Sequence, residues 1–243
     1  MLDAQVALER WYEGDLDGVF GPQTAGAARA AKWDLGFPAK QCTQTYGPVL
    51  DGILTGAIKP GPLYRLRARR RAAVETRWDK LYVLAVTQLG VRELPAGSNR
   101  VVYSAWYGMV GPWCAMFISW LVARAGIGTP FRYAYCPFIV ADARAGRGGL
   151  RVVGGPGLGV LALYDWRDDG VSDHVGLTVP EETLRRLVPT TLALAQRRSG
   201  TLRSGDFWAF EGNTSASSDS NGGQVMLRRR SRADVQAFVQ LPG

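Results

Sequence analysis

The feature that most constrains the fold is a change in hydrophobic periodicity near the glycine-rich stretch at residues 154–157. Before this stretch, apolar residues recur at the spacing of helices. The clearest helical set is Trp78, Leu81, Tyr82, Ala85, Val86 and Leu89. After it, β-rich runs bounded by turn residues lie at 159–166, 173–179, 206–211 and 224–230. Helices followed by short strands predict an α+β domain, with helices packed on an antiparallel sheet.

Upstream of this domain, proline and glycine divide the chain into two further parts. Residues 1–59 predict a small helical domain, in which a turn at Asp17 and Gly18 precedes a helix beginning at Pro22. Residues 60–78 predict a linker that is either a solvated basic helix or a contact for a polyanion. Its arginines are Arg65, Arg67, Arg69, Arg70, Arg71 and Arg77. The larger domain then occupies residues 79–243.

Charge and composition narrow the class of protein. The net charge is +8 and the pI about 9.7, so nucleic acid, an anionic membrane and an anionic cell wall are all suitable partners. No apolar run reaches the roughly 18 residues of a membrane helix, which argues against membrane insertion. Residues 1–5 lack the basic and apolar regions of a secretory signal, so we expect synthesis and folding in a cytoplasm.

Cysteine and histidine usage argues against a disulfide framework and a metal site. The three cysteines are an odd number, and no C-x-x-C pair occurs. One histidine in the whole chain leaves a zinc site without ligands. We therefore predict neither a metal nor another cofactor.

The chemistry-bearing candidates are Cys114 and His174. Cys114 falls in the first turn of a helix predicted to end at Gly126, where the helix dipole stabilises a thiolate. The competing interpretation is a small buried hydrophobic residue. His174 opens a predicted strand, which holds a general base firmly, and Gly176 on the same face leaves room beside the imidazole.

A third group must orient the imidazole in sites of this kind. Asp173 is rejected because its side chain points to the opposite face of the strand from His174. Glu211 and Asn213 close the next predicted strand and share one side if extension persists through Gly212. Both remain candidates, and a simple strand end followed by a turn is the alternative.

Taken together, these segments resemble the CHAP family, the cysteine- and histidine-dependent amidohydrolases and peptidases. Residues 113–120 resemble the family's nucleophile helix, 159–164 with 173–176 its strands carrying the base, and 211–214 the segment of its acidic and amide partners. Residues 99–106 are similar to the approach to the nucleophile in many phage lysins. The resemblance covers residues 78–232.

The resemblance implies a papain-like fold and hydrolysis of amide bonds in peptidoglycan. In that scheme Cys114 attacks the carbonyl, His174 moves the proton, and Glu211 or Asn213 orients the imidazole, while the backbone N–H of Cys114 serves the oxyanion. Two departures from the family are visible. Residues 181–204 predict an inserted helix or long loop, and no aspartate-rich calcium loop precedes the nucleophile.

Residues 1–59 resemble the peptidoglycan-binding domain often fused to wall hydrolases, through the turn and helix start at 17–24. We interpret Asp17, Gly18 and Gly21 as structural. A wall hydrolase without a signal peptide is similar to a phage endolysin, held in the host cytoplasm until lysis. The arginine- and alanine-rich composition suggests an actinobacterial host, and nothing indicates a dimer, so we expect a monomer.

Several alternatives remain open from the sequence. The cut bond is either the amide between the glycan lactyl group and the first alanine or one within the stem or cross-bridge. We expect Trp106, Tyr107, Trp113 and Trp208 to shape the substrate pocket, and Cys42 and Cys136 to be buried or loop thiols. A competing hypothesis is a non-catalytic wall-binding or virion structural protein. Another is a nucleic-acid binder, although no such motif is recognisable.

Overall fold

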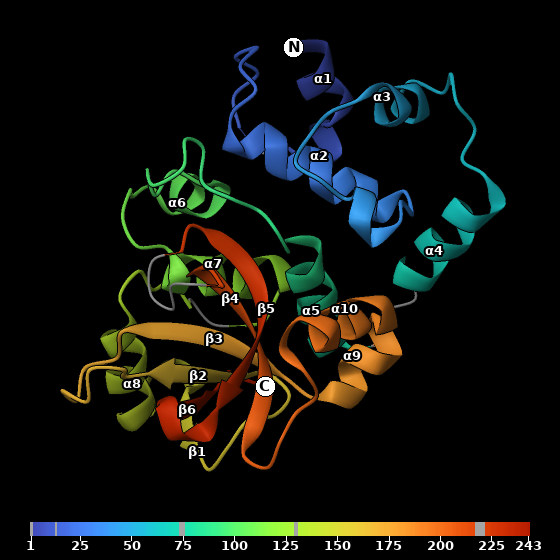
Figure 1. The fold of residues 1–243 in the computed structure, drawn as a ribbon. Coiled ribbons are helices and arrows are strands. Elements are labelled where there is room, and N and C mark those ends of the chain that lie inside the picture. The colour runs from blue at the N-terminus through green and yellow to red at the C-terminus, as the bar shows by residue number, and fades with distance from the viewer. Residues whose placement is uncertain (1, 13, 73–75, 129–130, 217–221) are drawn as a thin grey trace.

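The computed structural model describes residues 2–12, 14–72, 76–128, 131–216 and 222–243, and combines helices with an antiparallel sheet (Figure 1). This arrangement confirms the α+β class. Part of the predicted linker, residues 73–75, and the side chains of Arg70 and Arg71 lie outside what is described. In the described part of the chain, no helix is both long enough and apolar enough to cross a bilayer.

The sheet has six strands in the order β1-β6-β2-β3-β4-β5, and every neighbouring pair is antiparallel. The strands are β1 (Arg151–Val153), β2 (Val160–Tyr164), β3 (His174–Val179), β4 (Asp206–Thr214), β5 (Gln224–Ser231) and β6 (Val235–Gln240). Four of them match the predicted runs. The sequence interpretation missed β1 and β6; β6 follows a short 3-10 turn and lies between β1 and β2.

The two faces of the sheet have separate apolar clusters. One face, with Leu161, Val175 and Leu177, belongs to the main core and packs on helix α7 (Cys114–Ala125). The other carries a smaller cluster that includes Tyr164 and Phe207. The period of two along each strand produces this division.

The remaining helices of the larger part surround the sheet. They are α5 (Arg77–Thr87), α6 (Val102–Tyr107), α8 (Cys136–Arg144), α9 (Glu181–Leu187) and α10 (Pro189–Ser199). Helix α7 ends at Gly126, whose left-handed φ of 67° suits a residue without a Cβ. The predicted insertion forms α9 and α10, and it leaves the pairing of β3 with β4 intact. Gly176 therefore lies directly opposite Glu211.

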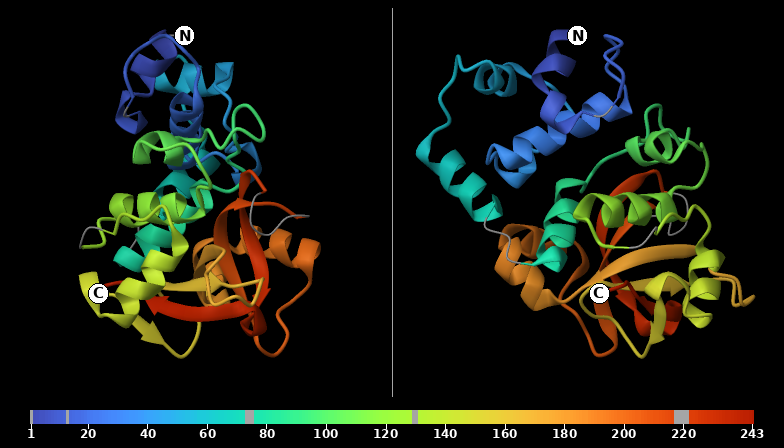
Figure 2. Two further views of the ribbon diagram at one scale, coloured as in Figure 1. Left: turned by 90° about the vertical axis from the view of Figure 1, so that its left-hand side faces the viewer. Right: turned by 180° about the vertical axis from the view of Figure 1, so that it is seen from behind.

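The N-terminal part consists of α1 (Leu2–Ala7), α2 (Pro22–Asp34), α3 (Pro48–Leu54) and, after a break, α4 (Pro62–Ala72). Helix α2 begins at Pro22, as predicted, and packs on α5 and α6. Leu8 and Trp33 belong to the same buried cluster as Leu81 and Phe117. The N-terminal helices thus share a core with the rest of the chain, and Figure 2 shows them seated on it from two sides.

Candidate active site

Cys114 is the first residue of α7, and only 4% of it is exposed. The N–H groups of a helix's first turn have no acceptor inside the helix, so they and the helix dipole favour a thiolate there. The preceding residue is firmly held, because Trp113 Nε1 donates to Glu93 Oε1 at 2.9 Å. The Phe117 N–H donates to the Trp113 carbonyl at 2.8 Å, which closes the first turn.

His174 is the first residue of β3 and is completely buried. Its ring stacks on Tyr164 and Trp166, with centroids 5.9 and 5.3 Å away. Its Nε2 lies 3.3 Å from Glu211 Oε2, although neither ring nitrogen has the alignment of a hydrogen bond with a described residue. Stacking and the neighbouring carboxylate therefore fix the plane of the imidazole.

Glu211 is the buried carboxylate of the site, and the strand opposite makes room for it. A Cβ at Gly176 would lie 2.9 Å from Glu211 Cγ and 3.1 Å from the Tyr164 hydroxyl oxygen. Arg230, from β5, donates from Nε to Glu211 Oε1 at 2.7 Å and from Nη2 to Oε2 at 2.5 Å. The guanidinium also lies over the Tyr164 and Trp166 rings, 5.3 and 5.2 Å from their centroids.

A second thiol touches the first. The sulfur atoms of Cys114 and Cys136 lie 3.6 Å apart, and Cys136 is the first residue of α8. The Cys136 thiol, followed by the nearby imidazole of His174, holds the pKa of Cys114 well below its ordinary value, against the opposing effect of burial. The same contact, together with burial, raises the pKa of Cys136. Cys114 is therefore the thiolate of the pair.

The charges of the imidazole and the carboxylate support one another. Burial alone would lower the pKa of His174, but contacts with Cys114 and Glu211 raise it to about 9. Burial would likewise raise the pKa of Glu211, but hydrogen bonds from Arg230 and the proximity of His174 lower it to about 2. At neutral pH neighbouring groups of the site thus alternate in charge: a thiolate, an imidazolium, a carboxylate and a guanidinium.

Of the two residues predicted to orient His174, the structure brings only Glu211 to the ring. Asn213 lies within β4, has a left-handed φ of 57°, and falls where the pairing with β5 is irregular. Its Oδ1 accepts from the Gly223 N–H at 3.4 Å, and its carbonyl accepts from the Gly222 N–H at 2.9 Å. Asp173, which the sequence argument rejected, pairs with Arg167 at 2.6 Å.

The four aromatic residues expected to shape the substrate pocket do not lie together. Trp113 and Trp208 have no exposed surface, so the structure does not place them where a substrate could touch them. Trp106 and Tyr107 are partly exposed on α6 and flank Arg132, whose guanidinium lies 4.9 and 4.6 Å from their ring centroids. Alternation along β4 explains the error for Trp208, because that residue faces the main core.

Sequence reasoning missed two residues of this site, Arg230 and Cys136. Arg230 reaches Glu211 diagonally across β4 and β5, a contact that depends on the register Phe207 opposite Arg230. Cys136 carried one usable signal, since Pro137 after it is typical of a helix start. Both thiols therefore begin helices, but their meeting depends on tertiary packing.

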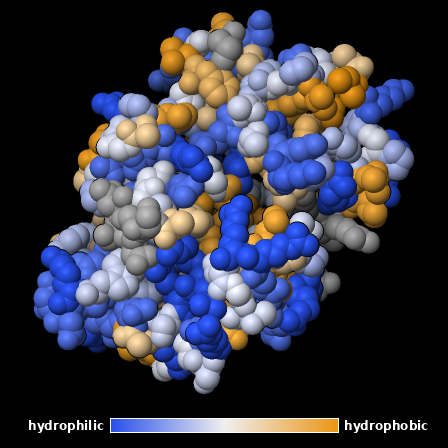
Figure 3. All heavy atoms as spheres, in the orientation of Figure 1, coloured by the Kyte–Doolittle hydropathy of each residue, from blue (hydrophilic) through white to orange (hydrophobic). Residues whose placement is uncertain are grey.

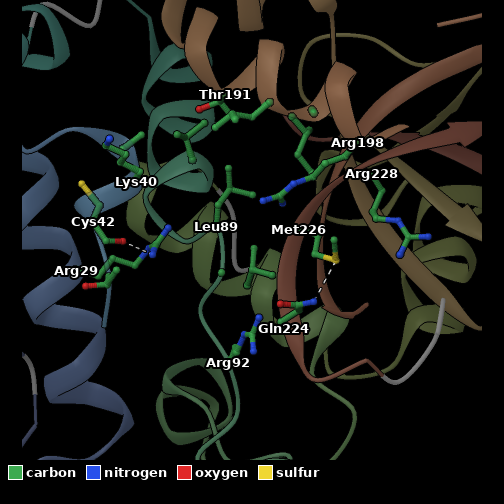
Figure 4. Close-up of a pocket in the computed structure, with 18 of the residues that line it drawn as sticks. Arg29, Lys40, Cys42, Leu89, Arg92, Thr191, Arg198, Gln224, Met226 and Arg228 are labelled. Carbon is green, nitrogen blue, oxygen red and sulfur yellow. Dashed lines mark hydrogen bonds between the residues drawn. The ribbon is translucent and has the colours of Figure 1, made fainter. Parts of the chain in front are cut away.

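One large cavity of the described structure lies away from Cys114. A cavity of about 820 Å³ lies where the N-terminal helices meet α5, α10 and β5, and Cys114 is not among its lining residues (Figure 4). In the described ranges, no three side chains of histidine, cysteine, aspartate or glutamate are grouped to hold a metal ion. The arrangement around Cys114 is suited to nucleophilic attack on a carbonyl followed by proton transfer.

We compared the chain with protein-family models, with curated proteins and with solved structures, and none of the three comparisons gave a match. We therefore infer the function from the geometry of Cys114, His174, Glu211 and Arg230.

Proposed function

We propose that this chain is a cysteine hydrolase that cleaves amide bonds in bacterial peptidoglycan, with a papain-like catalytic domain of the CHAP type. The observation that carries the proposal is the contact of Cys114, at a helix start, with His174, which in turn lies beside Glu211 on the adjacent strand. A nucleophile, a base and a group that orients the base are the parts such a reaction requires.

In this proposal each group has one role. Nε2 of His174 faces Glu211, so Nδ1 is the nitrogen left to exchange a proton with Cys114. The thiolate attacks the substrate carbonyl carbon, and the free N–H groups at the start of α7 stabilise the oxyanion. The imidazolium then protonates the leaving amine, which leaves a thioester on Cys114. His174 next takes a proton from water, whose oxygen displaces the thiol and releases the carboxylic acid.

Charge and the N-terminal part support peptidoglycan as the substrate. The net charge of +8 suits an anionic wall. In the N-terminal turn, Asp17 Oδ1 accepts from Val19 N–H at 2.9 Å and from Gln5 Nε2 at 2.7 Å, as a structural residue would. We infer that these helices hold the wall while the larger part cuts it, and that the protein acts as an endolysin, released from the host cytoplasm at lysis.

The test is the clearing of purified actinobacterial walls by the wild-type protein and by Cys114→Ala. We expect the alanine variant to lose at least about 10⁴-fold in rate, because catalytic residues that act as a unit fail together. Cys42→Ser is the matched thiol control, since Cys42 is buried in the N-terminal part. Clearing by Cys114→Ala at the wild-type rate would overturn the assignment of the nucleophile.

The reaction products identify which amide bond of peptidoglycan is cut. Mass spectrometry showing new N-terminal alanine identifies an amidase, whereas new ends within the stem or bridge identify an endopeptidase. Both outcomes use the same residues, so the geometry at Cys114 does not separate them.

One observation favours the second candidate, a non-catalytic wall-binding protein: the sulfur of Cys114 lies in a residue only 4% exposed. Alkylation with iodoacetamide separates the two candidates. Rapid, selective modification of Cys114 at pH 6, where an ordinary thiol is protonated, supports the enzyme. Absence of both alkylation and wall clearing supports the binding protein.

A further inference from the structure

The junction cavity, of about 820 Å³, lies between the N-terminal helices and the larger part, where Figure 3 shows hydrophilic side chains around an apolar hollow. We propose that it is a second binding site, separate from Cys114, which takes the carboxylate-bearing stem peptide of a peptidoglycan fragment. The ligand class rests on the proposed function, whereas the site rests on the features of the cavity itself.

The charge of the cavity has one sign. Its basic side chains come from five segments of the fold: Arg29, Lys40, Arg92, Arg198 and Arg228 (Figure 4). No aspartate or glutamate is found among the described residues that line it. Converging like charges disfavour the folded state, so a cavity built from them gains most from an anionic occupant.

Three of these cations have no carboxylate partner among the described residues: Lys40, Arg92 and Arg198. Arg198 extends from α10 into the cavity (Figure 4). Arg29 is held differently, because it donates to the carbonyls of Thr87 and Cys42 and so forms a fixed positive wall. The free guanidinium groups are the donors best suited to carboxylates, which they bind in a bidentate manner.

One buried donor also lacks a partner. Gln44 lines the cavity, and its Oε1 accepts from the Arg92 N–H at 3.0 Å. Its Nε2 is buried and bonds to no described residue. A buried amide donor without an acceptor is costly unless a ligand supplies one, so Gln44 points independently to an occupant with oxygen acceptors.

The floor of the cavity favours a peptide over a phosphate polymer. Val86, Leu89, Val225 and Leu227 line it with apolar surface suited to alanine methyl groups. β5 is an edge strand, and Val225 already uses its outer N–H and C=O to bond Val91 and Gly90, both at 2.9 Å. Alternation turns the N–H and C=O of Leu227 to the same edge, where an extended peptide can pair.

The size and place of the cavity also suit this occupant. A volume of about 820 Å³ is in the range of pockets that hold ligands of several hundred daltons. Strands lie about 4.8 Å apart, so β5 is roughly 10 Å from β3, which carries His174. The cavity and the base therefore lie on one sheet, two strands apart.

The experiment measures binding without turnover, by calorimetry on the full chain carrying Cys114→Ala. The probe is a soluble disaccharide-peptide released from peptidoglycan, compared with the same fragment whose carboxylates are amidated, and with inorganic polyphosphate. Arg92→Gln with Arg198→Gln tests the cavity. Arg144→Gln with Arg151→Gln is the control of matched charge, because these exposed arginines lie on α8 and β1, outside the cavity.

We expect the cavity pair to weaken binding of the fragment by at least about tenfold, as for lost charge-assisted hydrogen bonds, and the control pair to change it less than about twofold. Amidation of the fragment should weaken its binding to the Cys114→Ala protein by a similar factor. It should weaken binding to the protein that also carries Arg92→Gln and Arg198→Gln little further. Equal losses in both pairs, or no loss in either, would overturn the proposal. Tighter binding of polyphosphate than of the fragment would overturn the choice of ligand.

Failure of this inference and failure of the hydrolase proposal have different signatures. If the wild-type protein clears walls but the cavity pair binds the fragment normally, only the second site is wrong. If the cavity pair loses binding but the wild type clears no wall, the site stands and the hydrolase proposal is wrong.

Discussion

The molecule uses positive charge in two contrasting ways, around Glu211 and around the junction cavity. At Glu211, an arginine and a histidine face one buried carboxylate, and each charged group has an opposite partner within the protein. At the junction, five basic residues converge with no acidic residue among the described lining. Paired charge therefore fixes internal groups in place, whereas Lys40, Arg92 and Arg198, which have no carboxylate partner among the described residues, are available to an outside molecule.

Of the changes considered, Glu211→Gln should have the largest effect, because it removes the buried charge that pairs with Arg230 and His174. It leaves Arg230 buried without its counterion, which typically costs about 3–5 kcal/mol in the free energy of unfolding. Urea denaturation measures the loss. Adding Arg230→Met should recover stability but not wall clearing, since His174 still lacks its carboxylate. An unchanged urea midpoint in the single variant would show that the ion pair contributes nothing.

The next largest effect should be the pH dependence of stability and activity, which distinguishes the charged groups around Glu211 from the junction cavity. The pKa of His174 is raised from 6.5 to about 9, so its stabilising contribution is complete below pH 6.5 and is lost as the pH rises through 9. The pKa of Glu211 is lowered from 4.5 to about 2, so its contribution is complete above pH 4.5 and is lost as the pH falls through 2.

Wall clearing should therefore decline as the pH rises through about 9, where the imidazolium loses its proton. Binding of the disaccharide-peptide to Cys114→Ala should stay level between pH 6 and 9, because arginines keep their charge there. Parallel pH profiles of rate and of binding constant make the measurement. A decline of both together near pH 9 would contradict the separation of the regions.

Cys136→Ala should have the smallest effect, and it tests how the second thiol influences Cys114. Removing the thiol 3.6 Å from Cys114 takes away the largest influence that lowers the pKa of Cys114, so that pKa should rise. The rate of alkylation by iodoacetamide at pH 6 should fall several-fold, with the His174 contact maintaining the rest. An unchanged pH profile of alkylation would mean that the second thiol plays no part.

Local signals explain why so much of the site could be predicted from sequence. Helix α7 has an apolar period and a terminal glycine, and β3 and β4 are short β-rich runs between turns, so Cys114, His174 and Glu211 could each be placed on an element. Arg230 depends on the register of β5, and Cys136 depends on how α8 packs near α7. These are non-local properties, which periodicity does not contain.

The same dependence on tertiary packing explains why the burial of the aromatic residues and the junction cavity could not be predicted from sequence. Trp113 and Trp208 read as pocket residues because they neighbour the site in sequence, yet core packing buries both. The five basic residues of the cavity are spread from Arg29 to Arg228, so no stretch of sequence displays them as a group. Arg65, Arg67 and Arg69, which did stand out in the sequence, do not line the junction cavity.

The core shared by the N-terminal helices and the larger part fixes the distance between the part proposed to bind the wall and the part proposed to cut it. Trp33 and Leu8 are buried with Leu81 and Phe117, so the spacing between the two parts is set by packing and not by the length of the linker. The two parts of the molecule are then held at a fixed distance from one another. We therefore propose that, as a wall hydrolase, the molecule selects bonds at a set distance from the point where it is anchored, and that exchanging its N-terminal helices for another binding module would remove this selection.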